Sequence, residues 1–429
     1  GGKARDAGMS CNSCHQQGAS NAKLFVPGLS KRPGTFDTSG ALFNPKADNG
    51  VFDPMTVPSL RGAKYLGPYG HDGRLASLRD FIRNVVVNEF AGKEPSDEIL
   101  DALVTYVQEI SFLPNPNLGA GGRLSKQASE AARRGEVLFN KSFPHDPSMS
   151  CVGCHTAIGF IDRMNGVTNV DVTYMPINCQ ACHEPHGQTV PTNNPHMIRA
   201  MTAVTLPDGT VVTNAGEGLL CMQCHQSRQN AATYATTYSS NFGPHHGPQG
   251  DMLEGVNGFN YGQVIPSSAH GAISNTCVTC HMQTLSSSDP NLLLAGGHTF
   301  EMASSNTMLV AACQQSHGPS VTTFNFPVAD YDGDGVIQGV QTEVQNLLNK
   351  LSTLLPNSKG VVDGLVKNPA PASTWTAPQL EADYNYQFVA NDGSLGIHNT
   401  AYIVGLLKAA IGNLSGVSAA GGMPDAWGM

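Results

Sequence analysis

Five short clusters of cysteine and histidine are the residues best suited to chemistry. Each has the form Cys-x-x-Cys-His, and we number them motifs 1 to 5 in chain order: Cys11, Cys14 and His15; Cys151, Cys154 and His155; Cys179, Cys182 and His183; Cys221, Cys224 and His225; Cys277, Cys280 and His281. Two thiols three residues apart can reach the two vinyl groups of one porphyrin, and the adjacent His can bind its iron. The pattern therefore predicts five covalently attached c-type haems.

Zinc sites and disulfides are the competing interpretation of paired cysteines. Zinc ribbons combine two Cys-x-x-Cys units, but they do not require a His directly after every second Cys. Five repeats of one pentapeptide in a chain with 11 Cys and 15 His favour haem attachment instead.

The remaining cysteine begins an altered sixth motif. In motif 6, Cys313 is followed by Ser316 in place of the second Cys, and then by His317. Serine cannot form a thioether, but one thioether, the bond from His317 to iron and burial can together hold a porphyrin. We expect a sixth haem here, and the alternative is a degenerate motif with a free cysteine.

Nine histidines lie outside the motifs, enough to give every iron a second axial ligand. Several sit beside Gly, Pro or Ser, where a turn lets an imidazole approach a flat ring. Some are expected to be ordinary surface or hydrogen-bonded residues, and Met is the other possible sixth ligand. The candidate distal ligands are His71, His186, His196, His245, His246, His270, His298 and His398.

Composition limits the kind of core and the kind of partner. Gly and Pro are frequent, with 47 and 27 residues, and only 40% of the chain is hydrophobic. We therefore expect extensive loops and a core filled partly by haem faces. A net charge of −9 without a basic run argues against nucleic acid as a partner, and no apolar stretch approaches the length of a membrane span.

The motifs are spaced unevenly and divide the chain into three parts. The first two proximal histidines are 140 residues apart, whereas the later motifs follow closely. A Pro- and Gly-rich stretch near residue 118 indicates a linker. The predicted domains are residues 1–118 with haem 1, residues 119–317 with haems 2 to 6, and residues 318–429, which hold no motif and contribute a distal His.

Residues 57–73, which contain Tyr65, Pro68, His71 and Asp72, carry a resemblance in the first quarter of the chain. This stretch resembles the electron-transfer domain of the dihaem cytochrome c peroxidase and methylamine-utilisation haem protein family. The resemblance implies a class I cytochrome c fold. Peroxidase members of the family commonly place a ligand Met where this chain has Val85 to Val87, which makes His71 the candidate distal ligand.

A second resemblance covers roughly residues 150–412. The stretches 179–187, 268–281, 297–300 and 396–402 together resemble large multihaem cytochromes related to pentahaem nitrite reductase and octahaem oxidoreductases. The resemblance implies closely stacked haems with distal histidines from remote positions, here His186, His270, His298 and His398. The Cys-x-x-Cys-Lys motif of nitrite reductases is absent from this chain.

An acidic loop after motif 6 predicts calcium binding. Carboxylates at positions 1, 3 and 5, Gly at position 6 and an aliphatic residue at position 8 match an EF-hand-type loop. Position 12 is Gln rather than Glu, so either that amide or the nearby Glu343 would close the ligand shell. The candidate ligands are Asp330, Asp332, Asp334, Val336, Gln341 and Glu343, and a solvated acidic turn is the alternative.

Apolar positions at helical spacing predict helices over residues 96–107 and 344–355, and two more helices are expected over 377–389 and 399–414. Residues 131–139 resemble the helix that precedes a haem motif in class I cytochromes. The expected fold is mainly α with extensive loops: a class I cytochrome c-like domain followed by a haem-packed multihaem domain with little regular sheet. Asn399 is expected to cap the last helix, which places His398 at a rigid helix start.

Taken together, these features predict an electron-transfer protein with five or six mostly bis-His, low-spin c-type haems rather than an enzyme. The alternative is a periplasmic multihaem oxidoreductase of peroxidase or nitrite/hydroxylamine type with one open haem. Covalent haem attachment implies a periplasmic or extracellular location. The expected partners are redox proteins or extracellular electron acceptors, and a homopolymer forming an extracellular filament is a further hypothesis.

Overall fold

The computed structural model describes residues 10–19, 58–67, 69, 75–89, 92–111, 117–118, 124–143, 146–167, 176–184, 197–283, 285, 295–304, 307–356, 361–362, 365–366 and 371–416. Within these ranges the chain is mainly helical with little sheet, as predicted. None of the helices in the described ranges has both the length and the hydropathy needed to cross a membrane.

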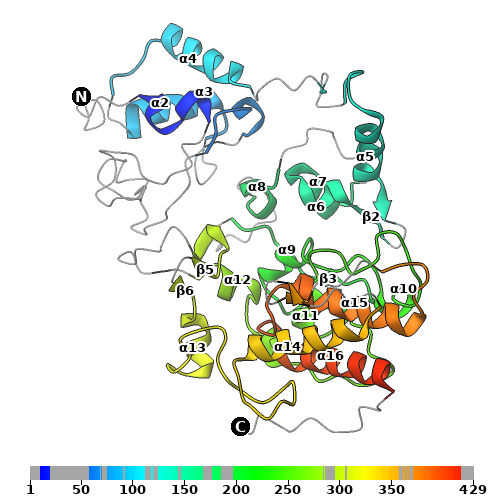
Figure 1. The fold of residues 1–429 in the computed structure, drawn as a ribbon. Coiled ribbons are helices and arrows are strands. Elements are labelled where there is room, and N and C mark those ends of the chain that lie inside the picture. The colour runs from blue at the N-terminus through cyan, green and yellow to red at the C-terminus, as the bar shows by residue number, and fades with distance from the viewer. Residues whose placement is uncertain are drawn as a thin grey trace.

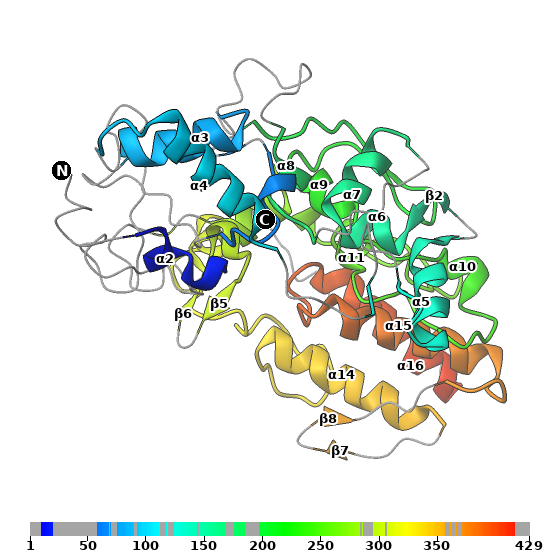
Figure 2. The same ribbon diagram turned by 90° about the horizontal axis from the view of Figure 1, so that it is seen from above.

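Three helices form the N-terminal part, which lies at the opposite end of the molecule from the C-terminal helices (Figures 1 and 2). They are α2 (Cys11–Cys14), α3 (Leu78–Asn84), which continues as a π-helical turn over Val85–Glu89, and α4 (Asp97–Glu109). Ser96 caps α4 by accepting a hydrogen bond from the N–H of Ile99, as its sequence predicts. Leu78 and Leu100 are buried between α3 and α4.

Short helices and two-stranded ribbons make up the middle of the chain. The helices are α5 (Glu130–Asn140), α6 (Cys151–His155), α7 (Ala157–Met164), α8 (Cys179–Cys182), α9 (Gly218–Met222), α10 (Ala231–Tyr234), α11 (Gln249–Glu254), α12 (Cys277–His281) and α13 (Ala311–His317). The antiparallel ribbons pair β1 (Ser142–Phe143) with β2 (Asp146–Ser150), β3 (Val204–Thr205) with β4 (Val211–Val212), and β5 (Ala303–Ser304) with β6 (Thr307–Met308).

Three long helices at the C-terminal end form the largest side-chain core. They are α14 (Val340–Leu354), α15 (Ala377–Asp392) and α16 (Thr400–Ser415), and the ribbon of β7 (Val361–Val362) and β8 (Leu365–Val366) lies beside α14 (Figure 2). Tyr384 and Phe388 are fully buried at their centre. The same core includes Phe242 and Met252, so it draws side chains from both sides of residue 318.

The five helices predicted from the sequence are confirmed, with ends shifted by a few residues. Asn399 caps α16 by accepting a hydrogen bond from the N–H of Tyr402, and His398 directly precedes it. The apolar stripe of α14 is buried in the core, as predicted.

Candidate haem-binding sites

All six motifs lie on single turns of helix. Motifs 2, 5 and 6 fall within α6, α12 and α13. In motifs 1, 3 and 4 the His lies just beyond the helix, and its backbone N–H donates to the carbonyl of the first Cys at 2.8–2.9 Å. Residues i, i+3 and i+4 share one face of a helical turn. The turn therefore directs the motif residues to one side, as attachment of a single porphyrin requires.

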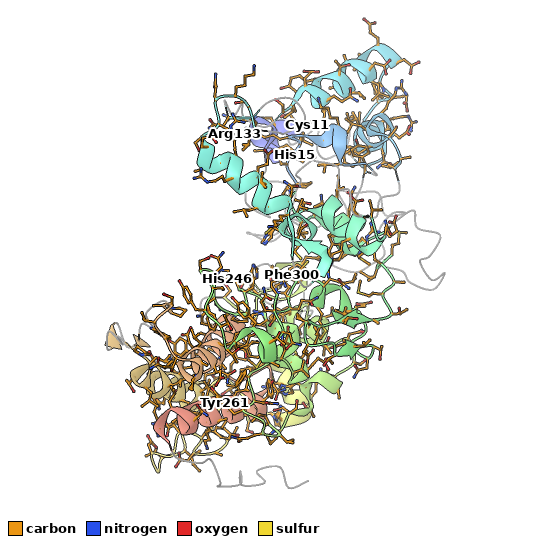
Figure 3. The ribbon with its side chains drawn as sticks, turned by 90° about the vertical axis from the view of Figure 1, so that its right-hand side faces the viewer. Cys11, His15, Arg133, His246, Tyr261 and Phe300 are labelled. Carbon is orange, nitrogen blue, oxygen red and sulfur yellow. The ribbon has the colours of Figure 1, made fainter. Side chains whose placement is uncertain are left out.

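Local sequence explains why these turns begin where they do. Ser150 caps α6 by accepting a hydrogen bond from the N–H of Gly153, and Asn178 caps α8 by accepting one from the N–H of Gln180. Each cap directly precedes the first Cys of its motif. Figure 3 shows motif 1 near the N-terminus, where Cys11 lies on α2 and His15 lies close to it, directly after the helix.

The cysteines do not form a zinc site within the described residues. The one group of three or more metal-ligating side chains found there is acidic and contains no cysteine. Burial raises the pKa of Cys182, and burial next to Cys313 and Cys277 raises the pKa of Cys280 to about 11. A hydrogen bond from Cys221 instead lowers the pKa of Cys277 to about 6, so the motif thiols differ in their protonation.

Three motif histidines face histidines from remote parts of the chain. The ring centres are 6.0 Å apart for His183 and His298, 5.9 Å for His317 and His270, and 6.2 Å for His281 and His398. Two imidazoles bound to opposite faces of one metal, at about 2 Å each, place their ring centres about 6 Å apart. The distances between the ring centres therefore match those expected for two axial ligands of one iron.

The other candidate histidines are placed less completely. His71, His186 and His196 lie outside the described residues. His245 and His246 are ring neighbours at 5.4 Å. Burial is the main cause that lowers the pKa of His245 to about 4, and the charges of Arg228, His246 and His155 lower it further. The influence of His155 indicates that His245 lies near motif 2.

Hydrogen bonds to Nδ1 orient several of these imidazoles. The acceptors are the carbonyl of Pro58 for His15 at 2.7 Å, the carbonyl of Phe300 for His281 at 2.9 Å, the carbonyl of Ile397 for His270 at 2.8 Å, and the carboxylate of Asp392 for His398 at 2.6 Å. A ring that donates from Nδ1 presents the lone pair of Nε2, which is the form that binds a metal.

Burial keeps most of these rings neutral. It is the largest influence on His15, His270 and His281, and it lowers the pKa of each. Burial opposes charge on His398 as well, but the charge of Asp392 and its hydrogen bond outweigh it and raise the pKa of His398. His398 therefore differs from these three histidines, because a carboxylate stabilises its charged form.

Two loops connect the motifs to one another. In residues 296–300, His298 faces motif 3 while the carbonyl of Phe300 holds His281 of motif 5. The second loop, residues 391–398, begins with the last two residues of α15. Here His398 faces motif 5, while the carbonyl of Ile397 holds His270, which faces motif 6. Each loop thus positions candidate ligand histidines at two motifs.

Gln249 ties motif 4 to the same loop. Its Oε1 lies 3.2 Å from Nδ1 of His225, and its amide nitrogen donates to the carbonyls of Asn391 and Asp392. Residues 391–398 therefore connect to motifs 4, 5 and 6.

Close backbone approach places motifs 4 and 5 side by side. A Cβ on Gly218, at the start of α9, would lie 1.9 Å from Oγ1 of Thr276, which directly precedes α12. Thr276 and Asn275 both have positive φ, and Oγ1 of Thr276 donates to the carbonyl of Ala215. Only glycine allows this approach, which brings Cys221 next to Cys277.

Motifs 2 and 4 are also neighbours. Arg163 donates to the carbonyl of Gln223 at 2.7 Å, and the buried Arg228 donates to the carbonyl of Cys224 at 2.8 Å and approaches Sγ of Cys154 at 3.9 Å. Two guanidinium groups therefore hold the motifs together.

Several residues that position the motifs and their facing histidines were not predicted from the sequence. Asp392, Gln249 and Arg228 carry no motif, and Asp392 stands in an Asn-Asp-Gly stretch that indicates only a turn. The one available signal was the sequence proximity of Asp392 to His398.

The acidic loop after motif 6 is compact. Carboxylate oxygens of Asp330, Asp332 and Glu343 lie within 4.8 Å of one another, and Glu343 is fully buried. Glu343 accepts hydrogen bonds from the backbone N–H groups of Tyr331, Asp332 and Gln338. Gln341, in contrast, donates from its side-chain amide to the carbonyl of Ser394 at 3.1 Å. Of the two residues left open by the sequence, Glu343 is the one directed into the loop.

Comparison with known proteins gives one partial likeness. The chain is 26% identical over 128 residues to hydrazine synthase subunit gamma of Kuenenia stuttgartiensis. The match covers 28% of this chain and 33% of that relative, so the chain spans only a third of its length. No family model matches the chain, and no solved structure matches it.

Proposed function

We propose that this chain is a multihaem c-type cytochrome that conducts electrons through closely spaced, mostly bis-His haems. The observation that carries the proposal is the facing of motif histidines by remote histidines at 5.9–6.2 Å, in three independent pairs. Each pair combines a helix turn with a ligand from a different loop, which supports a six-coordinate iron at each.

The protein residues have three tasks in this function. The motif thiols attach the group, the paired histidines close both axial positions, and the acceptors at Nδ1 fix ring orientation. Bound haem supplies a one-electron couple whose potential depends on axial ligand, burial and hydrogen bonding. The shared loops at 296–300 and 391–398 support fixed spacing between neighbouring sites.

The sixth haem is part of the proposal. Motif 6 has the same helical turn as the others, and His317 faces His270 at the same spacing as the other pairs. Ser316 is exposed at the position of the missing Cys, so Cys313 would provide the single thioether.

Substitution of the remote histidines tests this function. His298→Ala and His270→Ala should each convert one haem from low spin to a form that binds cyanide, while haem content remains unchanged. Thr299→Ala is the matched control, because it alters the turn beside His298 without removing the ligand. If both His variants keep fully low-spin spectra, these residues are not axial ligands and the proposal fails.

A catalytic oxidoreductase is the second candidate. It is favoured by the partial likeness to hydrazine synthase subunit gamma, whose name assigns it to an enzyme. This function requires an iron with an open position, so the unmodified protein would bind cyanide and turn over hydroxylamine, nitrite or peroxide. The electron conduit requires neither behaviour.

We also propose that the acidic loop binds calcium. The buried Glu343 carboxylate and the loop carboxylates provide hard oxygen ligands, and the ion would fix the start of α14. A periplasmic or extracellular location and redox-protein partners follow from the proposed cofactor rather than from the fold.

A further inference from the structure

Asp392 has an unusual environment for a carboxylate. It is the last residue of α15, its side chain is fully buried, and Oδ1 lies 2.6 Å from Nδ1 of His398. Oδ2 accepts hydrogen bonds from the N–H and the hydroxyl of Ser394. Three hydrogen-bond donors therefore face the carboxylate: Nδ1 of His398 and the N–H and hydroxyl of Ser394.

The helix end and the burial are both unfavourable for the Asp392 carboxylate unless a positive charge lies nearby. The C-terminal end of a helix carries partial negative charge, which repels a carboxylate. Burial of an unpaired anion costs more still. Among the described residues, no Lys or Arg forms an ion pair with Asp392, and His398 is its charge partner. A cation reached through His398 would offset both costs.

Ser394 makes the geometry specific. Its hydroxyl donates to Asp392 while accepting from the backbone N–H of His398, and its carbonyl accepts from Gln341 of α14. Gly393, in a left-handed conformation, allows the chain to turn back directly after the helix. The carboxylate is thus clamped in the direction of the imidazole.

From this arrangement we infer that Asp392 is a positioning residue that lowers the reduction potential of the haem held by His281 and His398, making it lower than that of the haem held by His317 and His270. The inference rests on the proposed function. A carboxylate at Nδ1 makes an imidazole a stronger donor, and its negative charge stabilises ferric over ferrous iron.

The neighbouring pair provides the internal contrast. His270 also donates from Nδ1, but its acceptors are neutral carbonyls, of Ile397 at 2.8 Å and His398 at 3.3 Å. Both distal ligands are held by the same loop, and only one is bonded to a carboxylate. The loop therefore sets a difference in potential between two adjacent sites.

Spectroelectrochemical titration of the haem-loaded full-length protein tests the inference. In Asp392→Asn, which keeps an acceptor but removes the charge, one of the one-electron waves should shift to higher potential. We expect roughly a tenfold change in the ratio of reduced to oxidised haem at fixed poise, equivalent to about 59 mV for one electron. Asp392→Glu, which restores the charge, should lie closer to wild type than Asp392→Asn.

Two further variants separate tuning from general disruption. Asp383→Asn removes a buried carboxylate from the same helix and should leave every wave in place. Ser394→Ala loosens the clamp without touching the carboxylate and should shift the same wave by a smaller amount. An unchanged titration in Asp392→Asn, or equal shifts in Asp383→Asn, would overturn the inference.

Different results would contradict the proposed function and the inference about Asp392. If the wild-type protein contains no low-spin haem at motif 5, the proposed function fails. If that haem is low spin in both proteins and its wave does not move in Asp392→Asn, only the inference about Asp392 fails.

Discussion

The C-terminal helices and the motif-bearing segments build their interiors differently. Helices α15 and α16 each bury eight residues, and α14 buries seven. Helices α5, α12 and α13 bury none, although α12 and α13 carry motifs 5 and 6. The C-terminal region is held by side-chain packing, whereas α12 and α13 contribute no buried residue and are positioned by backbone contacts and paired histidines. Motif helices α6 and α9 lie between these extremes, because each buries a few residues in small clusters.

This difference indicates what each region needs in order to fold. Interlocked aromatic and aliphatic side chains, including Phe242 and Met252, stabilise α14 to α16. The motif turns are too short to be stable as isolated helices, so they depend on something that covers one face. Under the proposed function, the porphyrin rings provide that apolar surface.

Protein produced without haem attachment should show the largest contrast. We expect amide protection at residues 146–183 and 277–317 to fall by roughly a hundredfold or more, because their local stability depends on the cofactor. Helices α14 to α16 should retain protection. Hydrogen exchange followed by mass spectrometry measures both regions in one sample, and equal protection with and without haem would contradict the comparison.

Phe388→Ala should damage the other region. Phe388 is fully buried and stacks on Tyr384 with ring centres 6.1 Å apart, so its truncation should cost about 3–5 kcal/mol of unfolding free energy. The intact mass should still show the full number of haems. Chemical denaturation measures the stability, and loss of haem in this variant would show that the two regions are not independent.

The buried Asp251 should make stability depend on pH. Burial raises its pKa from 3.8 to about 6, although hydrogen bonds from Ser227 and Asn257 oppose this. The folded state then holds the proton more tightly than the unfolded state, so stability falls as pH rises from about 4 to about 6. Relative to Asp251→Asn, wild type should lose about 3 kcal/mol across this range. A stability difference that does not change with pH would refute the assignment.

Calcium removal should have a smaller, local effect. Chelation should lower wild-type stability by about 1–2 kcal/mol, because the start of α14 loses its fixed ligand shell. Glu343→Gln should abolish the response to chelator, whereas Gln341→Ala should retain it, since Gln341 bonds to Ser394 instead. Thermal melts with and without added calcium measure this, and a response lost in Gln341→Ala instead would reverse the ligand assignment.

Patterns local in sequence predicted much of the fold. Apolar periodicity located α4 and α14, the sequence also indicated α15 and α16, and Asn399 was correctly expected to cap the last helix. These features depend on residues within a few turns of one another. The cytochrome-like character of the domains, the haem sites and the calcium site stay predictions.

Arrangement between distant segments could not be obtained in this way. The facing of His281 and His398 joins residues 117 positions apart, and spacing alone gave no partner for any motif. Asp392 acts through a loop whose shape depends on Ser394 and Gln341, and Gln249 reaches the same loop from α11. Such contacts arise from packing of the whole chain, which no local pattern records.

Near-infrared magnetic circular dichroism of the oxidised, haem-loaded protein tests the central claim most directly, because it distinguishes bis-His, His/Met and high-spin ferric haem. The account predicts low-spin signals dominated by bis-His ligation, unchanged by cyanide. A high-spin signal that cyanide converts, or a purified protein without haem absorbance, would contradict the electron conduit.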